Sequence, residues 1–377
     1  MRIGINAAFL GGRSDGLTTY TRSIIGELSA SGHEVLVYTS DELESHWAGN
    51  ATRRRIPSPL RAGNGTVGNT LRVTAWCQAA LPLCVALDRA QVLLCTLPEG
   101  MVVPTCPQVV VVHDIIPLLF PDTGSRWSTY FRYVLPWVLR ASRCVIADSQ
   151  HTKNDLRRHY GLPEGRIEVV YPWVDPVFFS HLPDLPPQDH EDGPFFLFVG
   201  RLSPNKNLEM VVRAFAAIRR DVRHRLVCVL GITDDRDRRC LAEILDVAVR
   251  LGVRDRLHVY SGLSRAQLLF LYRNATALVL LSKYEGFGYP PLEAMATGTP
   301  AIVSDSTSLA EVAGPAGLCV SNTEPDQAAE AMKRLACDPP YRAQHSEAGK
   351  AHARTFSRER SGRMIRSILE RCAKGVA

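Results

Sequence analysis

Two glutamates with seven residues between them, Glu285 and Glu293, lie in the segment YEGFGYPPLEAMATGTP at residues 284–300. Apolar runs of strand length flank this segment at 275–281 and 301–304. We expect a strand, a glycine loop, a short helix and a second strand, with Glu285 at the strand end and Glu293 in the first helical turn. The start of such a helix attracts phosphate, and carboxylates accept hydrogen bonds from vicinal hydroxyls. The segment therefore suits a sugar nucleotide.

A second candidate site follows the apolar run FFLFV at residues 195–199. The next residues, GRLSPNKN at 200–207, place Arg201 and Lys206 on a loop that begins with Gly200 and leads into a helical pattern. Two cations on a glycine-led loop at a helix start can clamp an anion. The sequence therefore predicts a phosphate-binding pair here.

A histidine ends the buried apolar run at residues 108–112. His113 is expected at the carboxyl end of a strand, where α/β sheets bind their ligands. Asp114 either orients this histidine or caps the next turn. A glycine-rich loop at 11–16 joins the first strand to the first helix, and it either approaches a phosphate or forms a plain tight turn.

Composition limits the class of protein. The chain has 377 residues, of which 46% are hydrophobic and 22% charged, with a formal net charge of +6. This mild excess suits an anionic ligand or an anionic membrane surface, and we expect no nucleic-acid partner. The ten cysteines form no CxxC pair, so free thiols are favoured over disulfides or a zinc site. No apolar run approaches the roughly 20 residues that span a bilayer, and the polar start at MRIGINAAFL does not resemble a signal peptide. We expect a cytoplasmic protein.

The chain divides into two α/β halves. A stretch rich in proline, charge and histidine, HLPDLPPQDHEDG at 181–193, is typical of a linker. We therefore predict domains at 1–180 and 194–356. The segment at 125–143 mixes aromatic residues with arginines, which suits either core packing or a helix lying on a membrane surface.

Three of these strings resemble motifs of one protein family. EGFGYPPLEAMATGTPAIVSD is similar to the E-x7-E segment of retaining glycosyltransferases of the GT4 type, GRLSPNKN to their GR-x-x-x-x-KN signature, and VVVVHDIIPLLFP to their HD-x-x-P segment. The resemblance implies the GT-B architecture: two Rossmann-like domains facing across a cleft. In the family the last helix, here 357–377, crosses back to the N-terminal domain. Trp173 and Arg358 depart from the family pattern, which has glycine and tryptophan at these places.

The resemblance also implies residue roles. Arg201 and Lys206 would hold the donor diphosphate, Glu285 the donor sugar and Glu293 the ribose, while His113 would bind a hydroxyl of the donor sugar. The residues implied to be catalytic are His113, Glu285, Arg201 and Lys206. The implied donor site comprises Gly16, Gly200, Arg201, Lys206, Gly262, Glu285, Gly286, Phe287, Gly288 and Glu293. No metal or other cofactor is implied.

The implied reaction transfers a sugar from a nucleotide-sugar to an acceptor hydroxyl, with retention at the anomeric carbon. The strings are most similar to bacterial mannosyltransferases of polysaccharide and O-antigen assembly, which makes GDP-mannose the first choice of donor. The acceptor is left open among a glycan, a lipid-linked glycan and a small molecule, as is a peripheral contact with the inner membrane face. Alternatives are a GT-B sugar-nucleotide epimerase, a transferase that uses a UDP-sugar on a soluble natural product, and a catalytically silent sugar-nucleotide-binding subunit.

Overall fold

The computed structural model of the chain consists of two compact units. The first comprises Met1–Pro172 together with Arg358–Ala377, and the second comprises Trp173–Ser357. The structure describes residues 1–8, 10, 16–40, 42–57, 66–121, 126–180 and 185–375.

The first unit is built on a parallel sheet that has seven strands among the described residues, in the order β3-β2-β1-β4-β5-β6-β7. Its strands are β1 (Arg2–Asn6), β2 (Glu34–Thr39), β3 (Thr52–Arg55), β4 (Val92–Cys95), β5 (Gln108–Val112), β6 (Cys144–Ala147) and β7 (Ile167–Val169). The four residues of β4 and the five of β5 are all buried, as expected for strands that helices cover on both faces. The strand order reverses between β1 and β4, and such reversal points are where open α/β sheets bind ligands.

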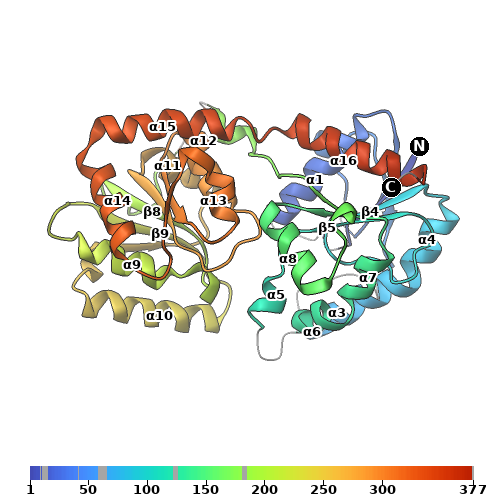
Figure 1. Ribbon diagram of the computed structural model, residues 1–377, viewed down its shortest axis with the longest axis horizontal. Coiled ribbons are helices and arrows are strands. Elements are labelled where there is room, and N and C mark those ends of the chain that lie inside the picture. The colour runs from blue at the N-terminus through green and yellow to red at the C-terminus, as the bar shows by residue number, and fades with distance from the viewer. Residues whose placement is uncertain are drawn as a thin grey trace. The chain divides into compact units, whose positions relative to one another are not determined.

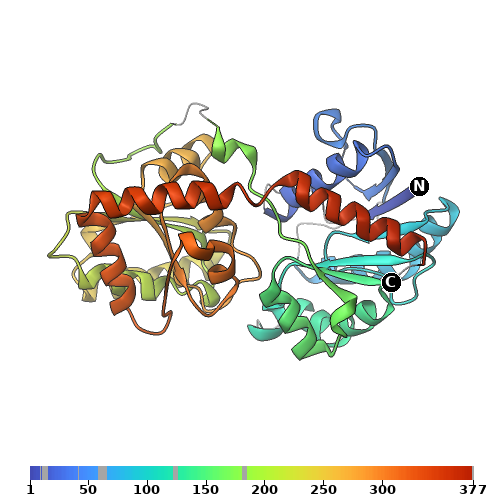
Figure 2. The ribbon, with the colours of Figure 1, turned by 45° about the horizontal axis from the view of Figure 1, so that its top comes forward.

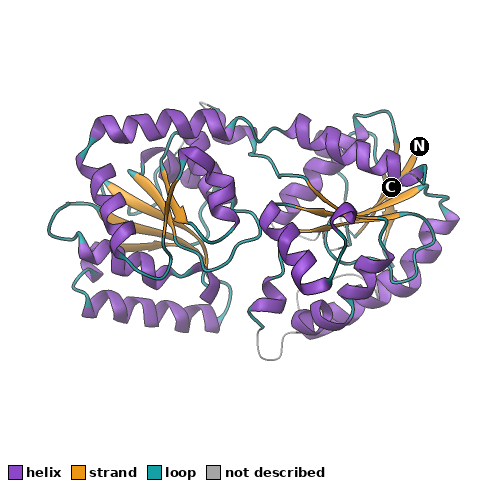
Figure 3. Ribbon diagram, viewed as in Figure 1, coloured by secondary structure: helices purple, strands orange, loops and turns teal. Residues whose placement is uncertain are grey.

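Helices cover both faces of this sheet (Figure 3). They are α1 (Gly16–Ser29), α2 (Ser45–Ala48), α3 (Thr66–Ala75), α4 (Leu81–Leu87), α5 (Ile116–Leu119), α6 (Arg126–Tyr133), α7 (Leu135–Ala141), α8 (Gln150–Tyr160) and the C-terminal α16 (Arg358–Ala373), with a 3₁₀ turn η3 (Glu164–Arg166). One turn of π-helix, η2 (Trp76–Ala80), joins α3 to α4. The aromatic and arginine-rich segment forms two helices, α6 and α7, rather than one.

The C-terminal helix α16 packs on the first unit, as the sequence predicted (Figures 1 and 2). Ser361 donates a hydrogen bond of 2.6 Å to the carbonyl of Tyr171, and Arg371 pairs with Glu168 of β7. Arg358, which replaces the family's tryptophan, pairs with Glu27 of α1 at 2.5 Å. An ion pair therefore holds the start of this helix.

The second unit is also doubly wound, with a parallel sheet that has six strands among the described residues, in the order β10-β9-β8-β11-β12-β13. The strands are β8 (Phe195–Arg201), β9 (Arg225–Gly231), β10 (Leu257–Tyr260), β11 (Ala277–Leu280), β12 (Ala301–Ser304) and β13 (Leu318–Val320). The helices are α9 (Leu208–Ala217), α10 (Asp235–Arg250), α11 (Arg265–Asn274), α12 (Tyr289–Thr297), α13 (Ser308–Ala313), α14 (Asp326–Cys337) and α15 (Pro339–Ala353). Short 3₁₀ turns are η4 (Pro176–Phe179), η5 (Pro204–Lys206), η6 (Arg254–Arg256) and η7 (Gly314–Ala316). The strand order reverses between β8 and β11.

The two units divide at Pro172 and Trp173, earlier than the predicted boundary at 180. The reason is that the segment after Trp173 is bound to the second unit. Phe178 is buried against the ring of Tyr272, with ring centroids 5.7 Å apart, and Asp175 pairs with Arg265 at the start of α11. The described part of the predicted linker, residues 185–193, also belongs to this unit.

Candidate active site

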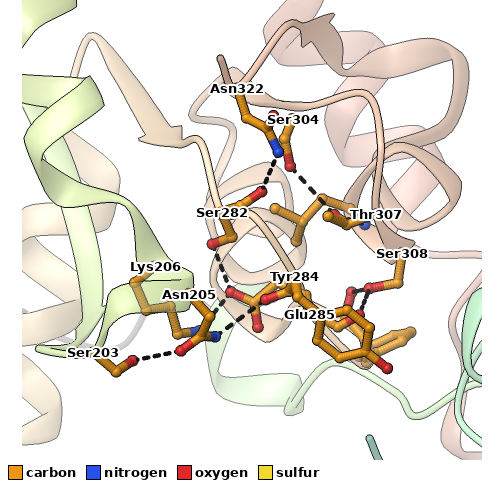
Figure 4. Close-up of polar contacts among 12 residues, drawn as sticks. Ser203, Asn205, Lys206, Ser282, Tyr284, Glu285, Ser304, Thr307, Ser308 and Asn322 are labelled. Carbon is orange, nitrogen blue, oxygen red and sulfur yellow. Dashed lines mark hydrogen bonds and ion pairs between the residues drawn. The ribbon is translucent and has the colours of Figure 1, made fainter. Parts of the chain in front are cut away.

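The candidate site of the second unit centres on an ion pair between two strand ends. Lys206 follows β8 and Glu285 follows β11, and these strands are neighbours in the sheet. The Nζ of Lys206 lies 2.6 Å from Oε1 of Glu285, and the Ser282 hydroxyl donates to the same oxygen at 2.7 Å (Figure 4). The Lys206 and Glu285 side chains are only 16% and 8% exposed. The two residues that were predicted to hold the diphosphate and the donor sugar therefore lie side by side.

Side-chain hydrogen bonds fasten the two loops to each other. Asn205 donates to the carbonyl of Tyr284 at 3.1 Å and accepts from the Ser203 hydroxyl at 2.8 Å, as Figure 4 shows. The backbone N–H of Lys283 donates to the carbonyl of Asn205 at 2.7 Å. The sequence analysis missed this role of Asn205, although the residue lies within the GRLSPNKN string. The contacts hold the Lys206–Glu285 pair in place.

The glycine loop ends where α12 begins, at Gly288. This residue has φ +118°, and a Cβ there would lie 2.4 Å from Cδ2 of Leu309, so glycine is required. Ser308 supports the same loop, because its hydroxyl lies 2.9 Å from the carbonyl oxygen of Glu285 and 2.8 Å from that of Phe287 (Figure 4). The predicted strand, glycine loop, helix and strand are confirmed.

Glu293 is the fifth residue of α12 and lies in its second turn, not in the first as predicted. The helix begins at Tyr289, one residue before the two prolines, so Glu293 is its fifth residue rather than its fourth. The Tyr272 hydroxyl donates a hydrogen bond of 2.7 Å to Oε2 of Glu293. Burial raises the pKa of Glu293 to about 7, although this hydrogen bond and the charge of Arg265 act in the opposite direction. Glu293 therefore titrates near neutral pH.

The other predicted donor residues of this unit lie around the same sheet edge. Gly200 and Arg201 end β8, and the Arg201 side chain is exposed. Gly262 follows β10 with φ +65° and has nothing within 4 Å of the place where a Cβ would stand. Among the described residues Glu285 forms its ion pair with Lys206 and none with Arg201, so only one of the two predicted cations contacts this carboxylate.

His113 is the predicted site residue of the first unit, at the end of β5. Its Nδ1 lies 2.6 Å from Oδ2 of Asp148, and its Nε2 lies 2.9 Å from the carbonyl oxygen of Thr96. Burial alone would lower the pKa of His113, but the charge and hydrogen bond of Asp148, with the Thr96 carbonyl, raise it to about 9. Both ring nitrogens are therefore engaged as donors of an imidazolium, and a sugar hydroxyl would have to replace Thr96.

Asp148 is a site residue that the sequence analysis missed. It follows β6, the neighbour of β5, so the carboxyl ends of both strands meet at one edge. Asp114, by contrast, accepts from the backbone N–H of Ile116 at 2.8 Å and so caps the next turn rather than orienting His113. Gly16 begins α1, and residues 11–15 of the predicted glycine loop lie outside the described residues.

Two further predictions concern cysteines and membranes. All ten cysteines are free thiols, as predicted. Within the part of the chain that the structure describes, no group of three or more His, Cys, Asp or Glu side chains could hold a metal ion. None of the described helices combines the length and the apolar character needed to cross a bilayer.

Comparisons with known proteins agree with this fold. The profile of "Glycosyltransferase Family 4" matches residues 14–178, and that of "Glycosyl transferases group 1" matches residues 186–352. The O-antigen chain mannosyltransferase RfbU of Salmonella typhimurium is 31% identical over 228 residues, which cover 60% of each chain. The D-inositol 3-phosphate glycosyltransferase of Nocardiopsis dassonvillei is 29% identical over 253 residues, covering 62% of this chain and 57% of that protein. The matched stretch thus spans a little under two thirds of these relatives.

Solved structures share the architecture of the whole chain. Sucrose-phosphate synthase from Thermosynechococcus elongatus superposes with a TM-score of 0.76 at 20% identity, covering 98% of both chains. WaaG, a glycosyltransferase involved in lipopolysaccharide biosynthesis, gives a TM-score of 0.72 at 18% identity, covering 97% of this chain and 99% of that one. At such identities the likeness concerns the fold alone. With its two family matches, its two doubly wound units and its returning C-terminal helix, the chain belongs to the GT4 family of glycosyltransferases and has the GT-B fold.

Proposed function

We propose that this chain transfers a sugar from a nucleotide-sugar donor to an acceptor hydroxyl, with retention at the anomeric carbon. The observation that carries the proposal is the little-exposed Lys206–Glu285 pair, fixed by Ser282 at the loop that leads into α12. A cation and a carboxylate held in contact can bind the diphosphate and the sugar of such a donor side by side. The diphosphate binds the ammonium group, and sugar hydroxyls donate to the carboxylate.

The main catalytic effect would be electrostatic. Lys206, Arg201 and the start of α12 stabilise the negative charge that develops on the departing diphosphate. Because these groups offset the charge, we propose that the reaction needs no metal or other cofactor. A phosphate oxygen of the leaving group accepts the proton of the acceptor hydroxyl on the same face of the sugar. Retention by this route requires no covalent intermediate on a carboxylate, unlike the two-carboxylate scheme of retaining hydrolases.

Glu293 is the proposed ribose partner, and His113 the proposed partner of a donor-sugar hydroxyl. The Tyr272–Glu293 hydrogen bond orients one carboxylate oxygen of Glu293, and the ribose hydroxyls would donate to this group. His113 as an imidazolium would donate to the sugar in exchange for its bond to the Thr96 carbonyl.

We propose GDP-mannose as the donor and a glycan, lipid-linked or free, as the acceptor. Two relatives support mannose: RfbU, and the O-antigen chain mannosyltransferase B of Escherichia coli, which is 27% identical over 262 residues. A UDP-sugar is the second candidate, because a structure of Anabaena HepE with UDP and glucose shares the fold at a TM-score of 0.73.

We place the proposed enzyme in the cytoplasm, with a peripheral contact to the inner face of the membrane. Two exposed aromatic side chains on α6 and α7 support this contact: Tyr133 is 64% exposed and Trp137 is 58% exposed. The Arg140 guanidinium carbon lies over the Trp137 ring, 5.5 Å from its centroid, which combines the cationic and aromatic character of a helix that binds a membrane surface.

The first experiment is a thermal-shift screen against GDP, UDP, ADP and dTDP, each with and without its sugar. A ligand that binds only the folded protein raises the melting temperature. Transfer is then measured with the preferred donor, and the anomeric configuration of the product tests retention. Formation of a disaccharide rather than an epimerised sugar nucleotide or its free sugar excludes the epimerase alternative.

The matched variants are Lys206→Met, Glu285→Gln and, as control, Lys283→Met. Lys283 is exposed on the loop that carries Glu285, so Lys283→Met removes the same charge as Lys206→Met but leaves the Lys206–Glu285 pair intact. We expect kcat/KM to fall about 10²- to 10³-fold for the first two variants and to stay near the wild-type value for the control. A folded Lys206→Met or Glu285→Gln protein with unchanged kcat/KM would refute the proposed site.

A further inference from the structure

A buried carboxyl group with one unpaired oxygen lies near the carboxyl end of a strand of the first sheet. Glu99 belongs to the loop that follows β4, beside the point where the strand order reverses between β1 and β4. The residue is 7% exposed, and its Oε2 atom has no hydrogen-bond partner among the described residues. Burying an acceptor without a partner is costly, so such a group needs an explanation.

The loop that carries Glu99 is held by side chains from three other elements. Tyr130 of α6 donates to the carbonyl of Pro98 at 3.1 Å, and Asn6 of β1 donates to the carbonyl of Glu99 at 2.9 Å. Gln78 of the π-helical turn donates to the carbonyl of Gly100 at 2.8 Å and accepts from the N–H of Val102 at 2.9 Å. Every one of these bonds goes to the loop backbone, so they fix the position of Glu99 without satisfying its Oε2.

The π-helical turn η2 contributes to this arrangement. Trp76 donates from Nε1 to Oδ1 of Asn6 at 3.0 Å, which orients the Asn6 amide toward the Glu99 backbone. A π turn changes the direction of successive side chains, and such turns are frequent at functional sites. The turn therefore aims Trp76 and Gln78 at the support of this loop.

The chemistry around Glu99 selects a neutral polar ligand. Its ionisable neighbours are His113 at the end of β5, Tyr130 of α6, Cys77 of η2 and Cys95 of β4. Burial raises the pKa values of the tyrosine and both thiols, so these three groups are neutral. A carboxylate here would repel a phosphate, whereas a hydroxyl can donate to the unpaired oxygen.

We propose that the unpaired oxygen of Glu99 binds a hydroxyl of the acceptor sugar. This inference rests on the proposed function, in which the acceptor supplies a sugar hydroxyl and the diphosphate is held by the second unit. The loop position is set before the ligand arrives, and the hydroxyl supplies the hydrogen bond that Oε2 lacks. Glu99 is thereby a binding residue for the acceptor rather than for the nucleotide.

The pH dependence of binding follows from the same geometry. Burial raises the pKa of Glu99 to about 7, while its own backbone N–H and the charge of His113 act in the opposite direction. The ionised carboxylate accepts a hydroxyl proton more strongly than the neutral acid. Acceptor binding is therefore expected to strengthen as the pH rises from 6 to 8, and this dependence is expected to disappear in Glu99→Gln.

The experiment measures binding of methyl glycosides of mannose, glucose, galactose and rhamnose to the whole protein by saturation-transfer NMR. Glu99→Gln keeps the size of the side chain and removes its charge, and Glu164→Gln, a carboxylate that is 63% exposed in η3, is the matched control. We expect the dissociation constant of the bound glycoside to rise about 10- to 100-fold in Glu99→Gln. The affinity for GDP and the behaviour of the control should stay within about two-fold of the wild type on the same reasoning.

Melting temperatures separate this role from a structural one. Because Glu99→Gln removes the charge of a buried carboxyl group whose Oε2 lacks a hydrogen bond, the ligand-free variant should melt no lower than the wild type. A folded variant that binds the glycoside as tightly as the wild type overturns the proposal, as does a wild-type protein that binds none of the four glycosides. Glycoside binding without any transfer from the nucleotide-sugars would instead refute the proposed function and leave the Glu99 result standing.

Discussion

The raised pKa of Glu293 predicts an unusual effect of its substitution. Glu293→Gln keeps the size of the side chain and its hydrogen bond with Tyr272 but removes the titration. A carboxyl group whose folded-state pKa exceeds its unfolded value stabilises the fold below the unfolded pKa, and this contribution is lost as the pH rises through the folded value. The wild type therefore loses stability between about pH 4.5 and pH 7 at this site, and the variant does not.

The magnitude follows from the size of the shift. The pKa of Glu293 rises from 4.5 to about 7. At about 1.4 kcal/mol per pH unit, this shift corresponds to roughly 3 kcal/mol of stability that is present at pH 4.5 and absent at pH 8. For a unit of this size, about 3 kcal/mol corresponds to roughly 6–12 °C in melting temperature. This free energy is an upper bound, because Glu293 is partly exposed and solvent screens its charge.

Differential scanning calorimetry at pH 5 and pH 8 tests this reasoning. The melting temperature of Glu293→Gln relative to the wild type should increase between the two pH values by several degrees. Tyr272→Phe is the matched variant with the opposite effect. It removes a hydrogen bond that lowers the pKa of Glu293, so the stability of this variant should fall more between pH 5 and pH 8 than that of the wild type. A difference between wild type and Glu293→Gln that is the same at both pH values would refute the argument.

Function should change in the opposite direction from stability. If the ribose hydroxyls donate to Glu293, the glutamine variant binds GDP more weakly even where it is the more stable protein. Isothermal titration with GDP at pH 8 measures this loss, which we expect to be about 10-fold or more. Unchanged GDP affinity in the folded variant would remove Glu293 from the nucleotide site.

Four other substitutions, two in each unit, test the local geometry. Gly288→Ala should lower the free energy of unfolding by about 2 kcal/mol or more, because it combines φ +118° with a Cβ 2.4 Å from Cδ2 of Leu309. Gly252→Ala, at φ +66° with nothing within 4 Å of the added Cβ, should lower it by about 1 kcal/mol through backbone strain alone. Equal urea midpoints for the two variants would contradict the predicted clash with Leu309. His113→Gln should destabilise the protein by up to about 3 kcal/mol below pH 6.5, because a pKa raised to about 9 stabilises the fold there and the effect is lost as the pH rises through 9. Asp148→Asn should behave alike, and urea titrations that show the same loss at pH 6 and pH 10 would refute the charged pair.

Local sequence was sufficient for much of the fold and of the donor loop. The apolar runs before Gly200 and Glu285 became buried parallel strands, and the glycines and prolines before Leu292 marked the start of α12. These features depend on neighbours within a few residues, so a linear pattern records them. The position of Glu293 in its helix was wrong by one residue, which moves it from the first turn into the second, because the two prolines occupy the second and third positions of α12 rather than the first two.

Pairing between distant segments required the tertiary structure. Lys206 and Glu285 are 79 positions apart, and their 2.6 Å contact depends on β8 and β11 being neighbours. His113 and Asp148 meet for the same reason, since β5 lies beside β6. No local spacing specifies which strands become neighbours.

The sequence by itself determined the strand, loop and helix around Glu285, the division into two α/β halves and the residue types that suit a sugar nucleotide, because apolar periodicity and turn residues act locally. Only the tertiary structure decided which charged side chains pair and which stay unpaired. It paired Asp148 with His113, placed the start of the second unit at Trp173 through the burial of Phe178, and left Oε2 of Glu99 without a hydrogen-bond partner among the described residues. Burial and strand order set these outcomes, and both are properties of the folded chain.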